Sequence, residues 1–172
     1  FQAVDHMAWD GLTNPYDGQS MGVFAESTVA KFGFTREEQD AYAIESVKRA
    51  QAAQANGAFD GEIVAVKVAT RKGEVEFAQD EQPGKSDIAK IPTPAFKKDG
   101  SVTAASSSSI SDGAAALVLL SADEAAKRGV QPLARIAAHA TFSQEPEWFT
   151  TAPIGAIKQV LDKAGWQVGD VD

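Results

Sequence analysis

The chain of 172 residues contains no cysteine, and this absence excludes three kinds of chemistry. Without cysteine the chain forms no disulfide, binds no metal through thiolates and offers no cysteine nucleophile of its own. Basic residues are also scarce, since 16 Lys and Arg against 24 Asp and Glu leave a net charge of −8. Nucleic-acid binding needs a basic face, so we expect no nucleic-acid partner.

Long apolar runs are missing too. No run approaches the ~18 residues of a membrane-spanning helix, and residues 1–10 carry two acids but neither lysine nor arginine, unlike a signal peptide. We therefore expect a cytoplasmic protein that does not associate with membranes. The chain starts at Phe1 without methionine and stops soon after a helical pattern, at Asp172, so we expect an interior segment of a longer chain.

Motifs for metal binding and hydrolysis are absent as well. The two histidines, His6 and His139, have no partner at metal-ligand spacing. The sequence has no Gly-x-Ser-x-Gly elbow and no Rossmann or Walker glycine pattern. We predict no metal site and no catalytic residue within this chain. The mildly basic stretch 85–98 could meet a phosphate, with Lys85 as a guess, but a solvated loop explains it better.

The elements that are present indicate an α/β architecture. Apolar residues at helical spacing, with capping residues at the ends, predict four helices: they are 21–32, 35–56, 121–128 and 153–164. Thr35 and Glu38 form the sequence pattern of a capping box. β-Branched and apolar runs predict strands: they are 62–70 with a hairpin partner at 74–78, 101–103, 114–121 and 133–142. We expect 1–20, 79–93 and 142–151 to be irregular loops.

Two polar or aromatic clusters are candidates for binding. Ser106–Ser109 is a run of four serines directly before the predicted buried strand, where a slender polar ligand could approach the backbone. A plain turn accounts for it about equally well. Trp148 and Phe149 lie in a predicted loop, where aromatic side chains either wall a pocket or plug a domain junction.

A series of short motifs runs along essentially the whole chain. The motifs are Met21-Gly22-x-x-Ala25-Glu26, Arg36-Glu37-Glu38-Gln39-Asp40-Ala41, Phe59 with Glu62-Ile63-Val64, Pro94-Ala95-Phe96, Gly100-Ser101-Val102-Thr103-Ala104, Ser111-Asp112-Gly113-Ala114-Ala115-Ala116, Ala152-Pro153-Ile154 and Lys163-Ala164-Gly165-Trp166. In this order they resemble the thiolase family, and most of all its acetyl-CoA acetyltransferase branch.

This resemblance implies an incomplete thiolase-like layered fold, made of a loop domain and parts of both core halves. By their order, residues 1–111 would be the coenzyme A-binding loop domain. Residues 112–131 would be the last strand and helix of the N-terminal core half, and residues 132–172 the start of the C-terminal half. The full-length form would be a homo-oligomer, a dimer or a tetramer.

The implied reaction is Claisen condensation and its reverse, thiolysis, between short acyl-CoA units. In the family a cysteine takes the acyl group, a second cysteine moves the proton, and oriented donors stabilise the enolate. The nucleophilic cysteine would precede this segment, and the histidine and second cysteine would follow it. The segment alone would be inactive, and the coenzyme A thioester would be its substrate, with no other cofactor.

The resemblance also assigns binding residues. Mapped by motif, the residues lining the pantetheine and adenine slot would be Leu12, Met21, Ala95, Phe96 and Ala104. Ser108 would hydrogen-bond the pantetheine arm, and Phe149 would wall the acyl end and, with Trp148, restrict it to short chains. The chain departs from the family pattern at several positions, among them Ser20, where some members carry histidine, and Phe149, where others carry methionine.

Two alternatives stay open. The chain could come from a thiolase-like protein that holds acyl-CoA or lipid without catalysis, which cysteine and histidine in flanking sequence would decide. It could also be an unfinished fold that assembles only with further chain, in which case its apolar strand 114–121 would aggregate when expressed alone.

Overall fold

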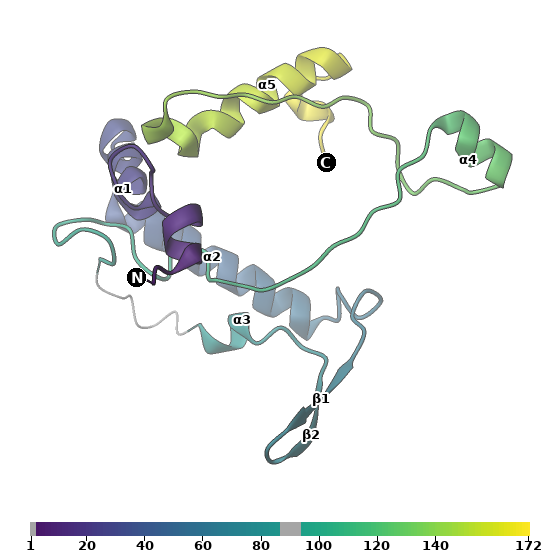
Figure 1. Cartoon of the computed structure of the whole chain (residues 1–172), viewed down its shortest axis with the longest axis horizontal. Helices are drawn as coiled ribbons and strands as arrows, with labels where there is room; N and C mark the ends of the chain where they lie inside the picture. Colours follow the sequence, from purple (N-terminus) through teal and green to yellow (C-terminus); the bar gives the residue numbers. More distant parts are fainter. Residues whose placement is uncertain (1–2, 87–93) are drawn as a thin grey trace. The chain divides into compact units, whose positions relative to one another are not determined.

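The computed structural model describes residues 3–86 and 94–172 (Figure 1). These residues divide into two compact units. Within the described residues, the first unit comprises residues 3–13 and Gln19–Ser109, and the second comprises Asn14–Gly18 and Ile110–Asp172. The predicted division at residues 111 and 131 rests on the family resemblance and stays a prediction.

Two capped helices, α1 and α2, organise the first unit. α1 (Met21–Phe32) ends at Gly33, whose φ of 68° is in the left-handed region that favours glycine. α2 (Arg36–Ala55) begins after Thr35, whose hydroxyl accepts the Glu38 N–H at 3.2 Å. The Glu38 carboxylate accepts the Thr35 N–H at 2.8 Å. The predicted helices and the capping box between Thr35 and Glu38 are therefore confirmed.

A two-stranded antiparallel hairpin follows α2. β1 (Val66–Thr70) pairs with β2 (Gly73–Phe77), so that Val66 lies opposite Phe77 and Val68 opposite Val75. The predicted hairpin is confirmed, but β1 begins four residues later than the predicted start at residue 62. The reason is local: the Ile63 N–H bonds to the Phe59 carbonyl at 3.1 Å, which keeps that stretch in a turn.

Two predicted loops of this unit contain short helical turns. η1 (Met7–Gly11) is a π-helical turn inside the predicted loop 1–20, and α3 (Gln82–Lys85) is a short helix inside the predicted loop 79–93. Pro83 lies in the first turn of α3, a position in a helix where proline is favoured. The Gln51 amide donates to the Pro83 carbonyl at 2.8 Å and so ties α3 to α2. Residues 87–93 of the predicted loop lie outside the described residues.

The second unit contains the two remaining predicted helices. α4 (Ala122–Arg128) begins at Ser121, whose hydroxyl accepts the Glu124 N–H at 3.2 Å. α5 (Ala152–Ala164) follows η2 (Pro146–Thr151), a 3-10 helix within the predicted irregular stretch 142–151. A 3-10 turn, η3 (Val168–Asp170), ends the chain's regular structure. The predictions for 121–128 and 153–164 are confirmed.

The strands predicted at 114–121 and 133–142 are wrong for this structure. Both stretches are extended but unpaired, as the trace leading to and from α4 shows (Figure 1). Leu117 is 87% exposed and Val118 89% exposed, where burial on both faces was expected. A strand exists only through hydrogen bonds to a neighbour, and no strand lies in the described part of this unit to provide one.

Candidate functional site

The segment 94–103 doubles back on itself in the first unit. The Ala95 N–H donates to the Val102 carbonyl at 3.0 Å, and Pro94 and Thr103 form an isolated antiparallel bridge. The strand predicted at 101–103 is therefore reduced to a single bridge. Val102 and Thr103 are buried, Thr103 completely. The second limb of the segment, residues 100–103, is therefore fixed by both its backbone bonds and its burial.

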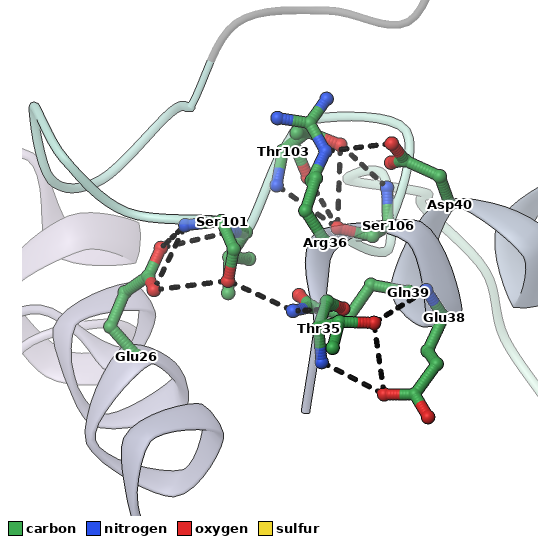
Figure 2. Close-up of polar contacts among 10 residues, drawn as sticks. Glu26, Thr35, Arg36, Glu38, Gln39, Asp40, Ser101, Thr103 and Ser106 are labelled. Carbon is green, nitrogen blue, oxygen red and sulfur yellow. Dashed lines mark hydrogen bonds and ion pairs between the residues drawn. The ribbon is translucent and has the colours of Figure 1, made fainter. Parts of the chain in front are cut away.

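Glu26 of α1 binds this limb through its carboxylate (Figure 2). Its oxygens accept the Val102 N–H at 2.8 Å and the Ser101 N–H at 3.0 Å. Glu26 is 8% exposed, and a charged residue is rarely buried unless its charge is hydrogen-bonded or paired. The two backbone N–H groups meet this requirement and attach the 94–103 segment to α1.

The N-terminus of α2 supplies a second attachment. The Gln39 amide donates to the Ser101 hydroxyl at 2.8 Å and to the Thr35 carbonyl at 3.1 Å (Figure 2). Hydrogen bonds from the Thr35 backbone and hydroxyl lower the pKa of Glu38, because both favour its charged form. The capping box and the 94–103 segment are thus linked through Gln39.

The serine run begins with two anchored residues. The Thr103 N–H donates to the Ser106 hydroxyl at 3.0 Å, and the Ser106 N–H donates to the Thr103 hydroxyl at 3.2 Å. The Ser107 hydroxyl donates to the Thr103 carbonyl at 2.7 Å. Ser108 follows these anchored residues and is exposed, so its hydroxyl is accessible to a ligand.

Several of the predicted binding residues come together at the start of α1. The Met21 N–H donates to the Leu12 carbonyl at 3.0 Å, and this bond joins the chain that precedes α1 to the first residue of the helix. The ring of Phe96 lies against Gly22, so closely that a Cβ at Gly22 would overlap it. Leu12, Met21 and Phe96 each keep about two fifths of their surface exposed. These partly exposed apolar residues lie around the first turn of α1, and Ala95 and Ala104 belong to the adjoining 94–104 stretch.

Phe149 is in the second unit, on η2, and is half-buried. The Gln144 amide holds this turn by donating to the Trp148 carbonyl and, at 2.7 Å, to the Thr151 hydroxyl. The Phe142 ring packs against Gly155 of α5, where an added Cβ would lie 2.5 Å from the ring. The stretch 142–151 was expected to be irregular, but it contains the 3-10 helix η2, and its Phe142 ring packs on α5.

The remaining candidates have ordinary roles. The His6 ring lies 3.1 Å from the Asp10 carboxylate, and the His139 carbonyl accepts the Lys163 ammonium at 3.0 Å. Lys85, the guessed phosphate ligand, pairs with Glu81 one turn earlier. The described residues include no group of three side chains suited to a metal ion. None of the helices described is long and apolar enough to cross a membrane.

Comparison with known families decides what this chain is. The family model described as "Thiolase, N-terminal domain" matches residues 1–123, and the one described as "Thiolase, C-terminal domain" matches residues 130–172. The chain belongs to the thiolase family. The predicted resemblance is thereby confirmed.

Individual thiolases match the chain over its whole length. It is 47% identical to the acetyl-CoA acetyltransferase of Rhizobium meliloti over 176 residues, covering 100% of this chain and 44% of the relative. It is 43% identical to the Shinella zoogloeoides enzyme of the same name, covering 100% of this chain and 45% of the relative. The chain thus spans less than half the length of these relatives.

Solved thiolase structures share the fold. The Acat5 thiolase from Ascaris suum, solved in complex with coenzyme A, has a TM-score of 0.88 at 39% identity; the match covers 99% of this chain and 44% of the Ascaris chain. The Bacillus anthracis acetyl-CoA acetyltransferase has a TM-score of 0.87 at 38% identity; the match covers 100% of this chain and 45% of the Bacillus chain. The predicted fold class, a thiolase-like fold present in part, is confirmed.

Sequence reasoning did not assign a role to Glu26, Gln39 or Thr103 in this thiolase segment. Glu26 is the single acidic residue of α1, whose other residues are apolar or small apart from Lys31, and this isolation was the available signal. Its partners at residues 101 and 102 lie 75 and 76 positions away. No local pattern connects residues so distant, so the partnership required the folded chain.

Proposed function

We propose that this chain is the substrate-binding segment of an acetyl-CoA C-acetyltransferase, which joins two short acyl-CoA units by Claisen condensation or cleaves the product by thiolysis. The matches to acetyl-CoA acetyltransferases, which cover the whole of this chain, support this proposal. The observation that carries it is the position of Leu12, Met21 and Phe96 around the first turn of α1, where all three are partly exposed. A ligand with long apolar and amide-containing parts, such as coenzyme A, suits partly exposed apolar side chains together with the exposed hydroxyl of Ser108.

Each binding residue has a proposed part. Leu12, Met21 and Phe96 line the slot for pantetheine and adenine, and Ala95 and Ala104 allow the ligand to approach the backbone closely. The Ser108 hydroxyl bonds to an amide of the pantetheine arm. Phe149 walls the acyl end. The acyl-CoA enters as a substrate, and the reaction uses no further cofactor.

The bond-making groups belong to other parts of the full-length protein. Because this chain has no cysteine, it supplies neither the acyl-accepting thiolate nor the second cysteine of the proposed reaction. Its contribution is to bind and orient the thioester. The chain alone is therefore inactive, and the working enzyme is a cytoplasmic homo-oligomer that binds neither nucleic acid nor membranes.

Thiolysis by the full-length protein tests the function. With acetoacetyl-CoA and coenzyme A, we expect formation of acetyl-CoA, and none from the 172 residues alone. Binding of acyl-CoA without turnover by the full-length protein would instead favour the non-catalytic alternative. In calorimetric titration with coenzyme A, Ser108→Val in the full-length protein should weaken binding; an unchanged affinity would remove Ser108 from the site.

The acyl-chain preference tests Phe149. In the full-length enzyme, Phe149→Ala should raise kcat/KM for longer or branched acyl-CoA relative to acetyl-CoA, because it removes a wall of the acyl end. Trp148→Ala, one residue earlier, shows whether both rings contribute. No gain with either variant would refute the proposed restriction to short chains.

A further inference from the structure

Glu26 has an unusual set of partners for a buried acid. Every polar partner that the structure gives its carboxylate, among the described residues, is a backbone N–H or hydroxyl of two consecutive residues, Ser101 and Val102. Oε1 accepts both N–H groups, at 3.0 and 2.8 Å. Oε2 lies 3.1 Å from the Ser101 nitrogen and 3.5 Å from its hydroxyl.

The backbone makes room for this carboxylate. A Cβ at Gly100 would overlap the Glu26 carboxylate, so the absence of a side chain there lets the acid reach the two N–H groups. The turn before it is closed by the Gly100 N–H, which donates to the Lys97 carbonyl at 2.9 Å. Glu26 is thus fitted to one position of the segment.

Further hydrogen bonds connect the partners of Glu26 to the proposed binding residues. Val102, whose N–H it accepts, returns its carbonyl to the Ala95 N–H at 3.0 Å, beside Phe96. The next residue, Thr103, holds Ser106 and Ser107 and is completely buried. Through Val102 and Thr103, the same carboxylate therefore fixes the two parts of the segment that carry four proposed binding residues. These are Ala95 and Phe96 in the first part, and Ala104 and Ser108 in the second.

We propose that Glu26 is a positioning residue for acyl-CoA: from α1, its carboxylate holds the 94–109 segment in its binding conformation through the Ser101 and Val102 N–H groups. The proposal rests on the proposed function. A segment that is ordered before the ligand arrives avoids the entropy cost of ordering during binding. Since Glu26 touches no reacting atom, losing it should weaken substrate binding more than it slows turnover.

Steady-state kinetics of the full-length enzyme with acetyl-CoA test this role. Glu26→Met keeps the length of the side chain but removes both acceptors, and KM should rise about tenfold while kcat stays within about twofold. Glu26→Gln can place its one oxygen where Oε1 accepts both N–H groups, so KM should stay within about threefold of the wild type. Glu37→Met is the matched control, because it makes the same change at an exposed acid of α2, and its KM should equal that of the wild type.

Three results would overturn the assignment: a wild-type KM in Glu26→Met, a loss confined to kcat, or a Glu26→Gln variant as impaired as Glu26→Met. Should Glu26→Met fail to fold, Gly100→Ala applies the test with the acid retained, since the added methyl group displaces the carboxylate. It should raise KM, and an unchanged KM overturns the role. If the wild-type enzyme neither turns over nor binds coenzyme A, the proposed function fails; if it does both, these variants judge Glu26 alone.

Discussion

Gly22 shows at the scale of one residue how a missing side chain shapes the candidate site. It lies in the first turn of α1, where a Cβ would overlap the Phe96 ring. Replacing a helical glycine with alanine usually stabilises a protein by about 0.5–1 kcal/mol. Gly22→Ala in the full-length protein should instead destabilise it by about 1 kcal/mol, because the ring must move.

Urea unfolding measures this difference. Gly84→Ala is the matched control, since Gly84 lies in α3 with open space where its Cβ would be, and we expect it to be neutral or stabilising. A Gly22→Ala protein that gains stability as the control does would show that Phe96 does not need the space.

Thr35 is a second residue whose effect can be stated in advance. Its hydroxyl accepts the Glu38 N–H, one of the backbone donors that the start of α2 leaves unpaired. Thr35→Ala should lower the free energy of unfolding by about 1 kcal/mol, measured by urea denaturation. Thr28→Ala is the control, because the Thr28 hydroxyl bonds to the Phe24 carbonyl within its own helix. Equal effects of the two substitutions would contradict a capping role.

At the scale of the element, the start of α2 should lose stability in acid. Hydrogen bonds from Thr35 lower the pKa of Glu38 from its ordinary value of 4.5. A lowered pKa in the folded state means that the charged form stabilises α2. This stabilisation is fully present above pH 4.5, the unfolded value, and disappears as the pH falls through the lower folded value.

Glu38→Ala tests the pH dependence directly. The variant should be less stable than the wild type at pH 7, and the difference between them should shrink as the pH is lowered below about 4.5. Glu37→Ala removes an acid from the same turn without removing a bond to Thr35, and corrects for the charge alone. A difference between wild type and Glu38→Ala that is constant across this pH range would rule out the mechanism.

At the scale of the whole molecule, the exposed apolar stretch of the second unit should decide how the 172 residues behave in isolation. Leu117 and Leu119 are largely exposed, and they point to the same side of an extended chain because side chains alternate. Unpaired apolar stretches of this kind associate with one another. The isolated chain should therefore self-associate, as measured by light scattering after gel filtration.

The double variant Leu117→Lys with Leu119→Lys should reduce this self-association. The control is the double variant Gln131→Lys with Ser143→Lys, which adds the same charge at two exposed polar positions. A monomeric, cooperatively melting wild-type chain would contradict the expectation and show that the 172 residues fold as a complete unit.

The sequence alone identified the features that depend on neighbours along the chain. Thr35 and Glu38 predicted the start of α2, and the turn at Lys72-Gly73 predicted the hairpin. Gly33 and Gly165 predicted the ends of α1 and α5. Each of these depends on hydrogen bonds or backbone angles within a few residues, so a short stretch of sequence carries the whole signal. Motif order likewise identified the family before any coordinates.

Only the tertiary structure decided which distant groups meet. The apolar run at 114–121 reads as a buried strand, but a strand needs a neighbour, and the described part of its unit has none. Glu26 reads as one more helix acid, yet it accepts the N–H groups of Ser101 and Val102 across the fold. Pairings over long separations cost chain entropy that only the whole fold repays, so no local pattern records them.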